Sequence, residues 1–323
     1  MQTEIKMKTT PTNQPFARVL DSQWANVGDN LKVRRALPAL HQNSVGPWVF
    51  LDHFGPMPTD PRGQGVPAHP HAGIETVTYL LEGGMAHRDS AGHEGRVEAG
   101  GVQWMTSGRG IVHAERPFDP AGNKNEAEFT LHGMQLWTSL PRALKMMPPR
   151  YQRIEAKDVP SVETNGVVVR VIAGESSGLR GPAEVLMPLF LWHVALQPGS
   201  QWQGQLPAGM EAGVYVMVGE ISVGGDDSKL RVGQLGIFTD NAGENAGTES
   251  DSITFGNNGN RLAHIMLLGG APAEGPLVFH GPFVMNSVEQ IRYVEKAYMT
   301  GQMGSLTEVV QARNVTNMKM ELG

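Results

Sequence analysis

The sequence predicts an all-β protein built from two β-barrel domains in tandem, with one short helix near the C-terminus. The chain has 323 residues, which is long for one compact domain and sufficient for two. Its 40 glycines and 22 prolines indicate many turns, and therefore many short strands. Short apolar or alternating runs recur between these turn signals in both halves, a pattern typical of β-sandwiches and β-barrels.

Strand-like runs in the first half are separated by glycine-rich turns such as Glu82-Gly83-Gly84 and Ala99-Gly100-Gly101. Glycine suits these turns because it adopts positive φ at little cost. The expected strands of this half span 46–51, 74–81, 96–98, 102–106, 111–115 and 128–137.

A second series with the same turns follows a stretch, 141–160, that is rich in proline and basic side chains. The expected strands of this series span 167–172, 190–196, 211–218, 229–232, 236–238, 252–255 and 261–268. We therefore expect a disordered arm over 1–14, an N-terminal domain over 15–140, a linker over 141–160, a C-terminal domain over 161–305 and a tail over 306–323.

A helix is expected to begin at Ser287, because Ser287 and Gln290 have the spacing of a capping box. Apolar residues then recur at helical spacing, and Gly301 can end the helix. The expected apolar stripe consists of Val288, Ile291, Val294 and Tyr298. We expect this stripe to dock on a barrel.

Composition limits the classes of function. A net charge of −6 and a pI of about 6.0 argue against direct nucleic-acid binding. The absence of cysteine excludes disulfides and thiolate metal sites. No apolar run approaches the roughly 20 residues that cross a bilayer, and the N-terminus lacks the apolar core of a secretory signal. We expect a monomer in the cytoplasm, with the nucleus as the alternative in a eukaryotic cell.

Two short motifs carry the chemistry of this chain: His69-Pro70-His71 and His113-Ala114-Glu115. The outer residues of each motif are two apart, so on a strand their side chains point to the same face. Two such strands side by side would gather three imidazoles and one carboxylate. These ligands suit one transition-metal ion, and Fe, Mn, Ni, Cu and Zn all accept them.

The same residues lie within the two signatures of the cupin barrel. Gly63, His69, His71 and Glu75 have the spacing of the first signature, and Gly110-Ile111-Val112-His113 has that of the second. Two positions depart from the pattern. Gly83 comes one residue late, and Gly108 stands where the second signature has proline.

Longer blocks resemble the pirin family of two-domain cupin proteins. The blocks span 34–38, 49–57, 69–83, 103–115 and 281–286, and the similarity runs from about residue 15 to about residue 305. This resemblance implies two jelly-roll-like cupin barrels in tandem, with one metal ion, usually iron, in the N-terminal barrel.

Carried over by motif, the metal ligands are His69, His71, His113 and Glu115. General cupins would recruit Glu75 instead, and the sequence permits both carboxylates. We favour Glu115 because the pirin blocks match more completely than the general signature. The second half has only dispersed histidines, so we expect no second metal site there.

Two functions follow from the resemblance. The first is an iron-dependent dioxygenase of the quercetin 2,3-dioxygenase type, which acts on flavonol-like enol substrates with O2 and uses Glu115 as ligand and catalytic base. The alternative is a metal- or redox-dependent regulatory protein that binds a transcription factor or a metabolic enzyme.

Other polar residues are expected at the surface. His87 and His93 flank a polar stretch that predicts a solvated hairpin. The basic residues Arg142, Lys145, Arg150 and Arg153 are expected to form a solvated face of the linker.

Overall fold

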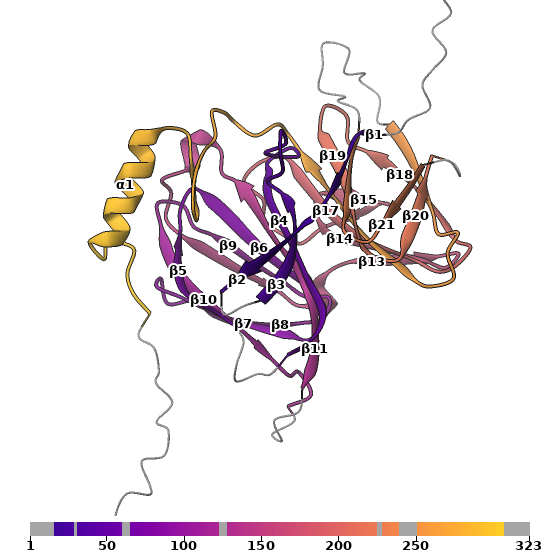
Figure 1. Cartoon of the computed structure of the whole chain (residues 1–323), viewed down its shortest axis with the longest axis horizontal. Helices are drawn as coiled ribbons and strands as arrows, with labels where there is room; N and C mark the ends of the chain where they lie inside the picture. The colour runs from indigo at the N-terminus through magenta and orange to yellow at the C-terminus, as the bar shows by residue number, and fades with distance from the viewer. Residues whose placement is uncertain are drawn as a thin grey trace, which may run out of the picture.

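The computed structural model describes residues 16–28, 31–59, 65–122, 128–224, 228–238 and 251–306. Over these residues the protein is all-β, with two β-domains in tandem and one short α-helix near the C-terminus (Figure 1). The predicted fold class is therefore confirmed. The predicted arm over 1–14 lies outside the described residues, as does the predicted tail except for residue 306.

The N-terminal domain contains a seven-stranded and a four-stranded sheet. The larger sheet has the order β12-β9-β6-β11-β4-β3-β2, and the smaller has the order β5-β10-β7-β8. The strands of the larger sheet are β12 (Arg150–Ile154), β9 (Val102–Thr106), β6 (Ile74–Glu82), β11 (Phe129–Ser139), β4 (Trp48–Thr59), β3 (Leu31–Leu37) and β2 (Gln23–Val27). The strands of the smaller sheet are β5 (Val66–His71), β10 (Ile111–Phe118), β7 (Gly84–Asp89) and β8 (Glu94–Glu98).

The C-terminal domain repeats this arrangement, with sheet orders β1-β22-β19-β24-β17-β14-β13 and β18-β23-β20-β21. The strands of its larger sheet are β1 (Phe16–Asp21), β22 (Gln234–Phe238), β19 (Glu211–Val218), β24 (Ala263–Gly270), β17 (Leu189–Leu196), β14 (Val167–Ala173) and β13 (Ser161–Thr164). The strands of its smaller sheet are β18 (Gln201–Leu206), β23 (Asp251–Gly256), β20 (Glu220–Val223) and β21 (Ser228–Arg231).

Short elements complete the chain. They are the 3₁₀ helices η1 (Arg142–Leu144) and η2 (Ala156–Asp158), the hairpins β15 (Glu175–Ser176) with β16 (Leu179–Arg180) and β25 (Val278–His280) with β26 (Phe283–Met285), and the helix α1 (Val288–Met299). Ser287 caps α1 by accepting a hydrogen bond from the Gln290 backbone N–H, as the capping box predicts. The buried face of α1 differs from the expected stripe, because Val288 and Tyr298 are exposed and Ala297 is buried.

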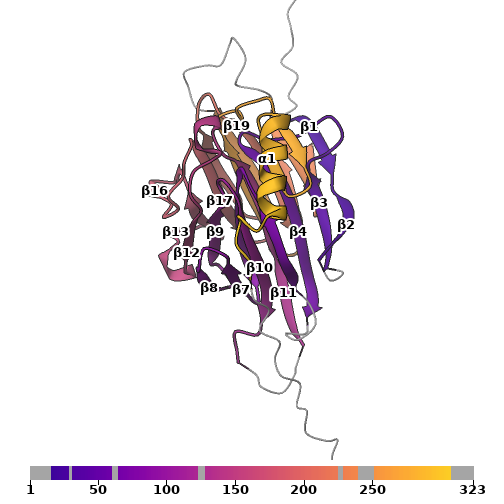
Figure 2. The same ribbon diagram turned by 90° about the vertical axis from the view of Figure 1, so that its left-hand side faces the viewer.

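Three segments of the described chain pair or pack with the domain on the other side of the expected boundary. Strand β1 pairs with β22 at the edge of the C-terminal sheet, and β12, within the expected linker, pairs with β9 in the N-terminal sheet. The C-terminal segment packs on the N-terminal domain, where Ala72 and Phe283 form a bridge. Figures 1 and 2 show α1 on the outer side of that domain. If the domains are defined by the sheets, their boundaries therefore differ from the sequence-based ones at β1, at β12 and at the C-terminal segment.

An identical row of residue types crosses four neighbouring strands in both large sheets. In β6, β11, β4 and β3 the Cα partners are Tyr79, Met134, His53 and Arg34. In β19, β24, β17 and β14 they are Tyr215, Met266, His193 and Arg170. The shared strand order and the shared row indicate that the two domains are copies of one structural unit.

The two rows meet at the interface between the domains. The Tyr79 hydroxyl lies 2.7 Å from Nδ1 of His193, and the Tyr215 hydroxyl lies 3.1 Å from Nδ1 of His53. Each of these histidines then contacts a second histidine of its own domain, His264 or His132, at 2.8 Å. Burial lowers the pKa of His53 to about 3 and that of His264 to about 4, so the interface contains neutral imidazoles.

One residue of the expected basic linker face is buried. Lys145 has no exposed area, and its Nζ donates to Gly73 O at 2.9 Å, Ser139 Oγ at 2.8 Å and Val284 O at 2.8 Å. The expected solvated position is therefore wrong for Lys145. Two of its three acceptors, Gly73 and Val284, are distant in the sequence. Burial lowers the pKa of Lys145 to about 7.

None of the helices in the described part of the chain is long and apolar enough to cross a bilayer.

Candidate metal centre

The three predicted histidine ligands converge in the N-terminal domain. Strands β5 and β10 are antiparallel neighbours in which His69 and His113 are Cα partners. Because His71 lies two residues from His69, its side chain points to the same side. Candidate ligand atoms of these three histidines all lie within 4.8 Å of one another.

The spacing of the ring nitrogens fits a shared ion. The Nε2 atom of His69 lies 3.1 Å from Nε2 of His71 and 2.9 Å from Nε2 of His113. Two ligands at right angles on a metal with bonds of about 2.1 Å would be about 3.0 Å apart. The described donor set therefore fits a metal ion bound by Nε2 atoms.

In two of the histidines, a backbone carbonyl contacts the other ring nitrogen, Nδ1, and so determines which nitrogen is protonated. Nδ1 of His69 lies 2.8 Å from Pro67 O, and Nδ1 of His71 lies 3.1 Å from Pro282 O. A carbonyl only accepts hydrogen bonds, so each Nδ1 is the protonated nitrogen. Each Nε2 then carries the lone pair that a metal needs.

The buried imidazoles are neutral at neutral pH. Burial, and next the charge of His69, lower the pKa of His71 to about 3, and the same causes lower the pKa of His113 well below its usual value. Convergent buried lone pairs without a shared proton are costly unless a cation joins them. This electrostatic arrangement is further support for a metal ion at the three nitrogens.

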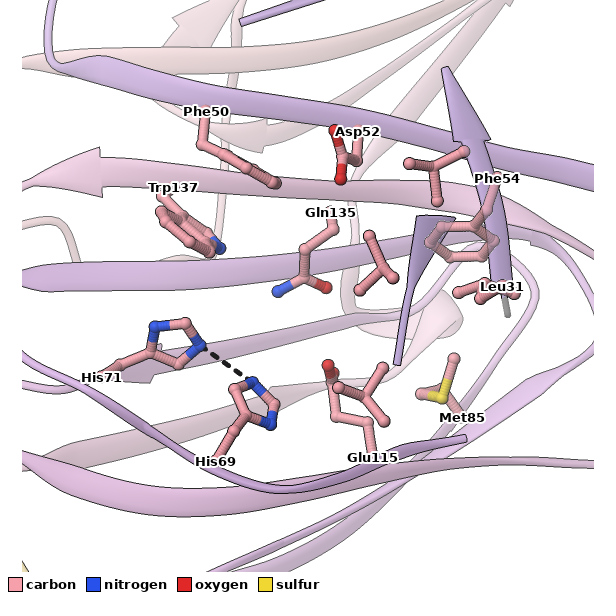
Figure 3. A pocket seen from close by; sticks show the side chains of 13 residues that line it. Leu31, Phe50, Asp52, Phe54, His69, His71, Met85, Glu115, Gln135 and Trp137 are labelled. Atoms are coloured by element: carbon pink, nitrogen blue, oxygen red, sulfur yellow. Dashed lines mark hydrogen bonds between the residues drawn. The ribbon is translucent and has the colours of Figure 1, made fainter. Parts of the chain in front are cut away.

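Glu115 lies on the cavity side of β10, two residues beyond His113. A register shift between these residues changes the pairing of β10 with β5. The Glu115 carboxylate lines the cavity together with His69 and His71, and Figure 3 shows it facing that cavity. The Thr78 hydroxyl donates to Oε1 of Glu115 at 2.9 Å.

The competing carboxylate, Glu75, lies elsewhere. It is fully buried on β6, where its oxygens accept from Thr106 Oγ1 at 2.7 Å and Thr138 Oγ1 at 3.2 Å. Burial raises the pKa of Glu75, although these hydrogen bonds oppose the shift. Within the described ranges, Glu75 belongs to no group of three or more potential metal ligands, and it does not line the cavity.

His87 lies beside the site, contrary to the solvated hairpin that the sequence predicts. Its ring is buried and stacks on Tyr151, with centroids 4.5 Å apart. Ligand atoms of His87, His113 and Glu115 also lie within 4.8 Å of one another. A signal existed in the sequence, because His87 and Asp89 have the same two-residue spacing as the predicted ligand pairs and share the inner face of β7.

The cavity beside the histidines has an aromatic wall. Phe50 stacks on Trp137 with centroids 4.0 Å apart, and Trp137 meets the ring of His71 edge to face. Arg35 lies over Phe50 and forms two hydrogen bonds of 2.8 and 2.7 Å with Asp52. This wall could hold a planar aromatic ligand within reach of the three histidines.

Gly108, which replaces the proline of the second cupin signature, has a local structural reason. Its φ is +52°, and a Cβ atom there would collide with the carbonyl oxygen of Met147. Proline cannot adopt positive φ, so this turn before the ligand strand requires glycine.

The histidines of the second half occupy other positions. His193 and His264 meet at the domain interface, and the exposed His280 pairs with Glu295 at 2.8 Å. Across the described residues, the groups of three or more potential ligands lie in the N-terminal domain.

Comparisons with known proteins agree with this fold. A model of the pirin family matches residues 30–138, and a model of the pirin C-terminal cupin domain matches residues 191–304. Human pirin is 36% identical over 276 residues, which cover 84% of this chain and 87% of pirin.

The chain belongs to the pirin family. The resemblance to pirins and the expected pair of cupin domains are thereby confirmed. Pirin-like protein 2 of Arabidopsis thaliana is 35% identical over 310 residues, which cover 93% of this chain and 90% of the relative. A solved quercetin 2,3-dioxygenase of Acinetobacter baumannii matches with 31% identity and a TM-score of 0.79, over 90% of this chain and 99% of its own.

Proposed function

We propose that this member of the pirin family is a metal-dependent dioxygenase of the quercetin 2,3-dioxygenase type, with iron preferred over Mn, Ni, Cu or Zn. The observation that carries the proposal is the convergence of three Nε2 atoms beside a cavity that also holds a carboxylate and an aromatic wall. The similarity to the solved quercetin 2,3-dioxygenase supports the same reaction class. Its partners would be a flavonol-like small molecule and O2.

His69, His71 and His113 would hold the metal, with Glu115 as the fourth ligand. When bound, the metal supplies Lewis-acid activation of an enol hydroxyl and redox chemistry toward O2. The aromatic wall formed by Phe50 and Trp137 would orient the planar rings of the substrate through stacking.

Glu115 would also accept the enol proton. Thr78 holds one of its oxygens by a hydrogen bond, which leaves the other oxygen to a ligand or a proton. The Thr78 hydroxyl also lies 2.7 Å from the side-chain amide of Gln135, another cavity residue. The Glu115 carboxylate is therefore oriented at the cavity, whereas both oxygens of Glu75 accept from threonine hydroxyls away from it.

The test is oxygen consumption and carbon monoxide release with quercetin by fully iron-loaded protein. We expect turnover by the wild type and a loss of about 10²–10⁴-fold in Glu115→Gln, the usual range for a missing general base. Glu75→Gln is the matched control and should turn over quercetin at close to the wild-type rate, with metal content measured in all three proteins. Absence of turnover by the iron-loaded wild type would exclude this substrate.

A metal-dependent regulatory role is the second candidate. The observation in its favour is the contact between Nδ1 of His71 and Pro282 O. Pro282 lies in the C-terminal segment that continues into α1, and one side of α1 is exposed. Capture of partners by metal-loaded and metal-free protein tests this role. Identical partner sets would argue against a metal-controlled interaction.

A further inference from the structure

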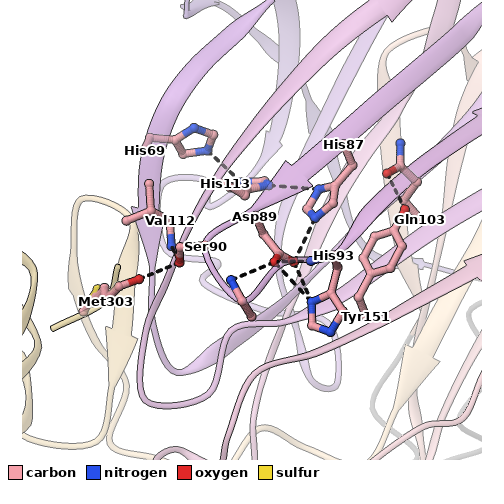
Figure 4. Close-up of polar contacts among 11 residues, drawn as sticks. His69, His87, Asp89, Ser90, His93, Gln103, Val112, His113, Tyr151 and Met303 are labelled. Carbon is pink, nitrogen blue, oxygen red and sulfur yellow. Dashed lines mark hydrogen bonds and ion pairs between the residues drawn. The ribbon is translucent and has the colours of Figure 1, made fainter. Parts of the chain in front are cut away.

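His87 and Asp89 form a buried polar pair directly behind the ligand His113. Both residues lie on β7, where Asp89 is the Cα partner of His113 and His87 is that of Glu115. The side chain of His87 is 2% exposed and that of Asp89 is fully buried. Figure 4 shows the line of contacts from Asp89 through His87 to His113.

The Asp89 carboxylate is surrounded by donors. It accepts from Nε2 of His87 at 3.1 Å, from Nδ1 of His93 at 2.9 Å, and from the backbone N–H groups of Ala91 and His93 at 2.9 and 3.0 Å. An ionised carboxylate can only accept hydrogen bonds, so Nε2 of His87 carries the proton of that ring. Nδ1 of His87 is then an acceptor.

This assignment fixes the proton of His113. Nδ1 of His113 lies 3.4 Å from Nδ1 of His87, a long contact in which one nitrogen must donate and the other accept. Because Nδ1 of His87 is the acceptor, Nδ1 of His113 is the donor. Nε2 of His113 is therefore unprotonated, and it is the atom that lies 2.9 Å from Nε2 of His69.

The ring of His87 is also held in place from its face. Tyr151 stacks on it at an interplanar angle of 12°, and the Tyr151 hydroxyl donates to Oε1 of Gln103 at 2.8 Å. Gln103 in turn donates to the carbonyl of Met85 at 2.9 Å. Rotation of the His87 ring away from His113 would break this packing.

We propose that His87 and Asp89 are positioning residues of the metal centre, which hold His113 in the tautomer and orientation that present Nε2 to the ion. Partners of this kind behind a metal-bound imidazole fix its tautomer and raise its basicity. The proposal rests on the proposed metal centre. It gives His113 a side-chain partner where His69 and His71 have backbone carbonyls.

Direct coordination by His87 is the competing role. In that case His113 would have to face the ion through Nδ1, because this is its nitrogen nearest to His87. The 2.9 Å approach of Nε2 of His113 to His69 would then lie outside the coordination sphere. The observed convergence of Nε2 atoms favours the positioning role.

Titration of the full-length protein with Co(II) tests the proposal through affinity. We expect Asp89→Asn and His87→Phe to weaken Co(II) binding by about 10–100-fold, the usual effect of losing such a partner. Phenylalanine retains the stacking on Tyr151 but not the acceptor. The matched control is His93→Ala, because His93 bonds the same carboxylate from a side chain that is 37% exposed and does not contact a ligand.

Proton NMR of the Co(II)-loaded protein provides a readout independent of activity. We expect three exchangeable, paramagnetically shifted ring N–H signals, one for each ligand histidine, with the His113 signal moved or broadened in Asp89→Asn and unchanged in His93→Ala. A shifted ring N–H signal assigned to His87, in place of that of His69, would show that His87 coordinates the ion and would overturn the proposal.

Circular dichroism and thermal melting identify variants that have lost their fold. Folded Asp89→Asn and His87→Phe proteins with wild-type affinity and an unchanged His113 signal would overturn the positioning role. A wild-type protein that binds no Co(II) would instead overturn the proposed metal centre itself, so the two failures are distinguishable.

Discussion

The two cupin domains have the same arrangement of sheets but different side chains in their interiors. Both have a seven-stranded and a four-stranded sheet in equivalent order, and both large sheets carry the row Tyr, Met, His, Arg. In the N-terminal domain the small sheet presents His69 and His113 beside a cavity. In the C-terminal domain the corresponding strands β18 and β23 carry Trp202 and Phe255, whose rings stack within an apolar core.

This difference shows that the arrangement of the sheets and the binding site are determined by different residues. The rows in the large sheets face the other domain and hold the two copies together. The proposed metal centre depends on the inner face of one small sheet. A filled interior should therefore contribute mainly to stability, and an interior with a cavity mainly to binding.

The largest expected effect is on the filled interior. Phe255 is fully buried, so Phe255→Ala should lower the free energy of unfolding by about 3–5 kcal/mol, through lost burial and the cavity that remains. Trp137→Ala in the N-terminal cavity should cost clearly less, because that ring already borders open space. Denaturant unfolding of both variants measures the contrast. Equal losses would contradict a difference between the interiors.

The next effect concerns the stability of the protein at acidic pH. The pKa of His53 is about 3 in the folded protein and near 6.5 in the unfolded chain, so the unfolded state binds more protons between these values. Stability should therefore fall as the pH decreases below about 6.5, by up to about 1.4 kcal/mol per pH unit for this group. In His53→Gln the slope of unfolding free energy against pH between 4 and 6 should be smaller by about that amount. An unchanged slope would contradict the buried neutral state.

The smallest effect tests the equivalence of the two rows. Tyr79→Phe and Tyr215→Phe each remove one hydrogen bond to a histidine of the other domain, so each should lower stability by about 1–2 kcal/mol. The two losses should be similar in size. A loss confined to one variant would show that the rows are not functionally equivalent.

Local patterns in the sequence predicted the parts of the site that depend on local geometry. His69 and His71 are two residues apart on one strand, so their shared face follows from strand geometry alone. The Ser287 cap of α1 was predicted for the same reason. The pairing of His69 with His113 needed, in addition, the resemblance to a known family.

Long-range pairing accounts for what the sequence did not predict. Lys145 was predicted at the surface because its acceptors Gly73 and Val284 are distant in the sequence and come close to it only in the folded protein. The Tyr, Met, His, Arg rows are dispersed over four strands each, so no sequence window contains them. His87 was missed because its strand was read as a polar loop.

Elemental analysis of purified His113→Ala beside His193→Ala tests the central claim most directly. Both histidines are buried, but only His113 lies among the converging nitrogen atoms of the N-terminal domain. We predict one metal ion per chain in the wild type and in His193→Ala, and loss of stoichiometric metal in His113→Ala. Stoichiometric metal retained by a folded His113→Ala protein would contradict the assignment of the metal centre.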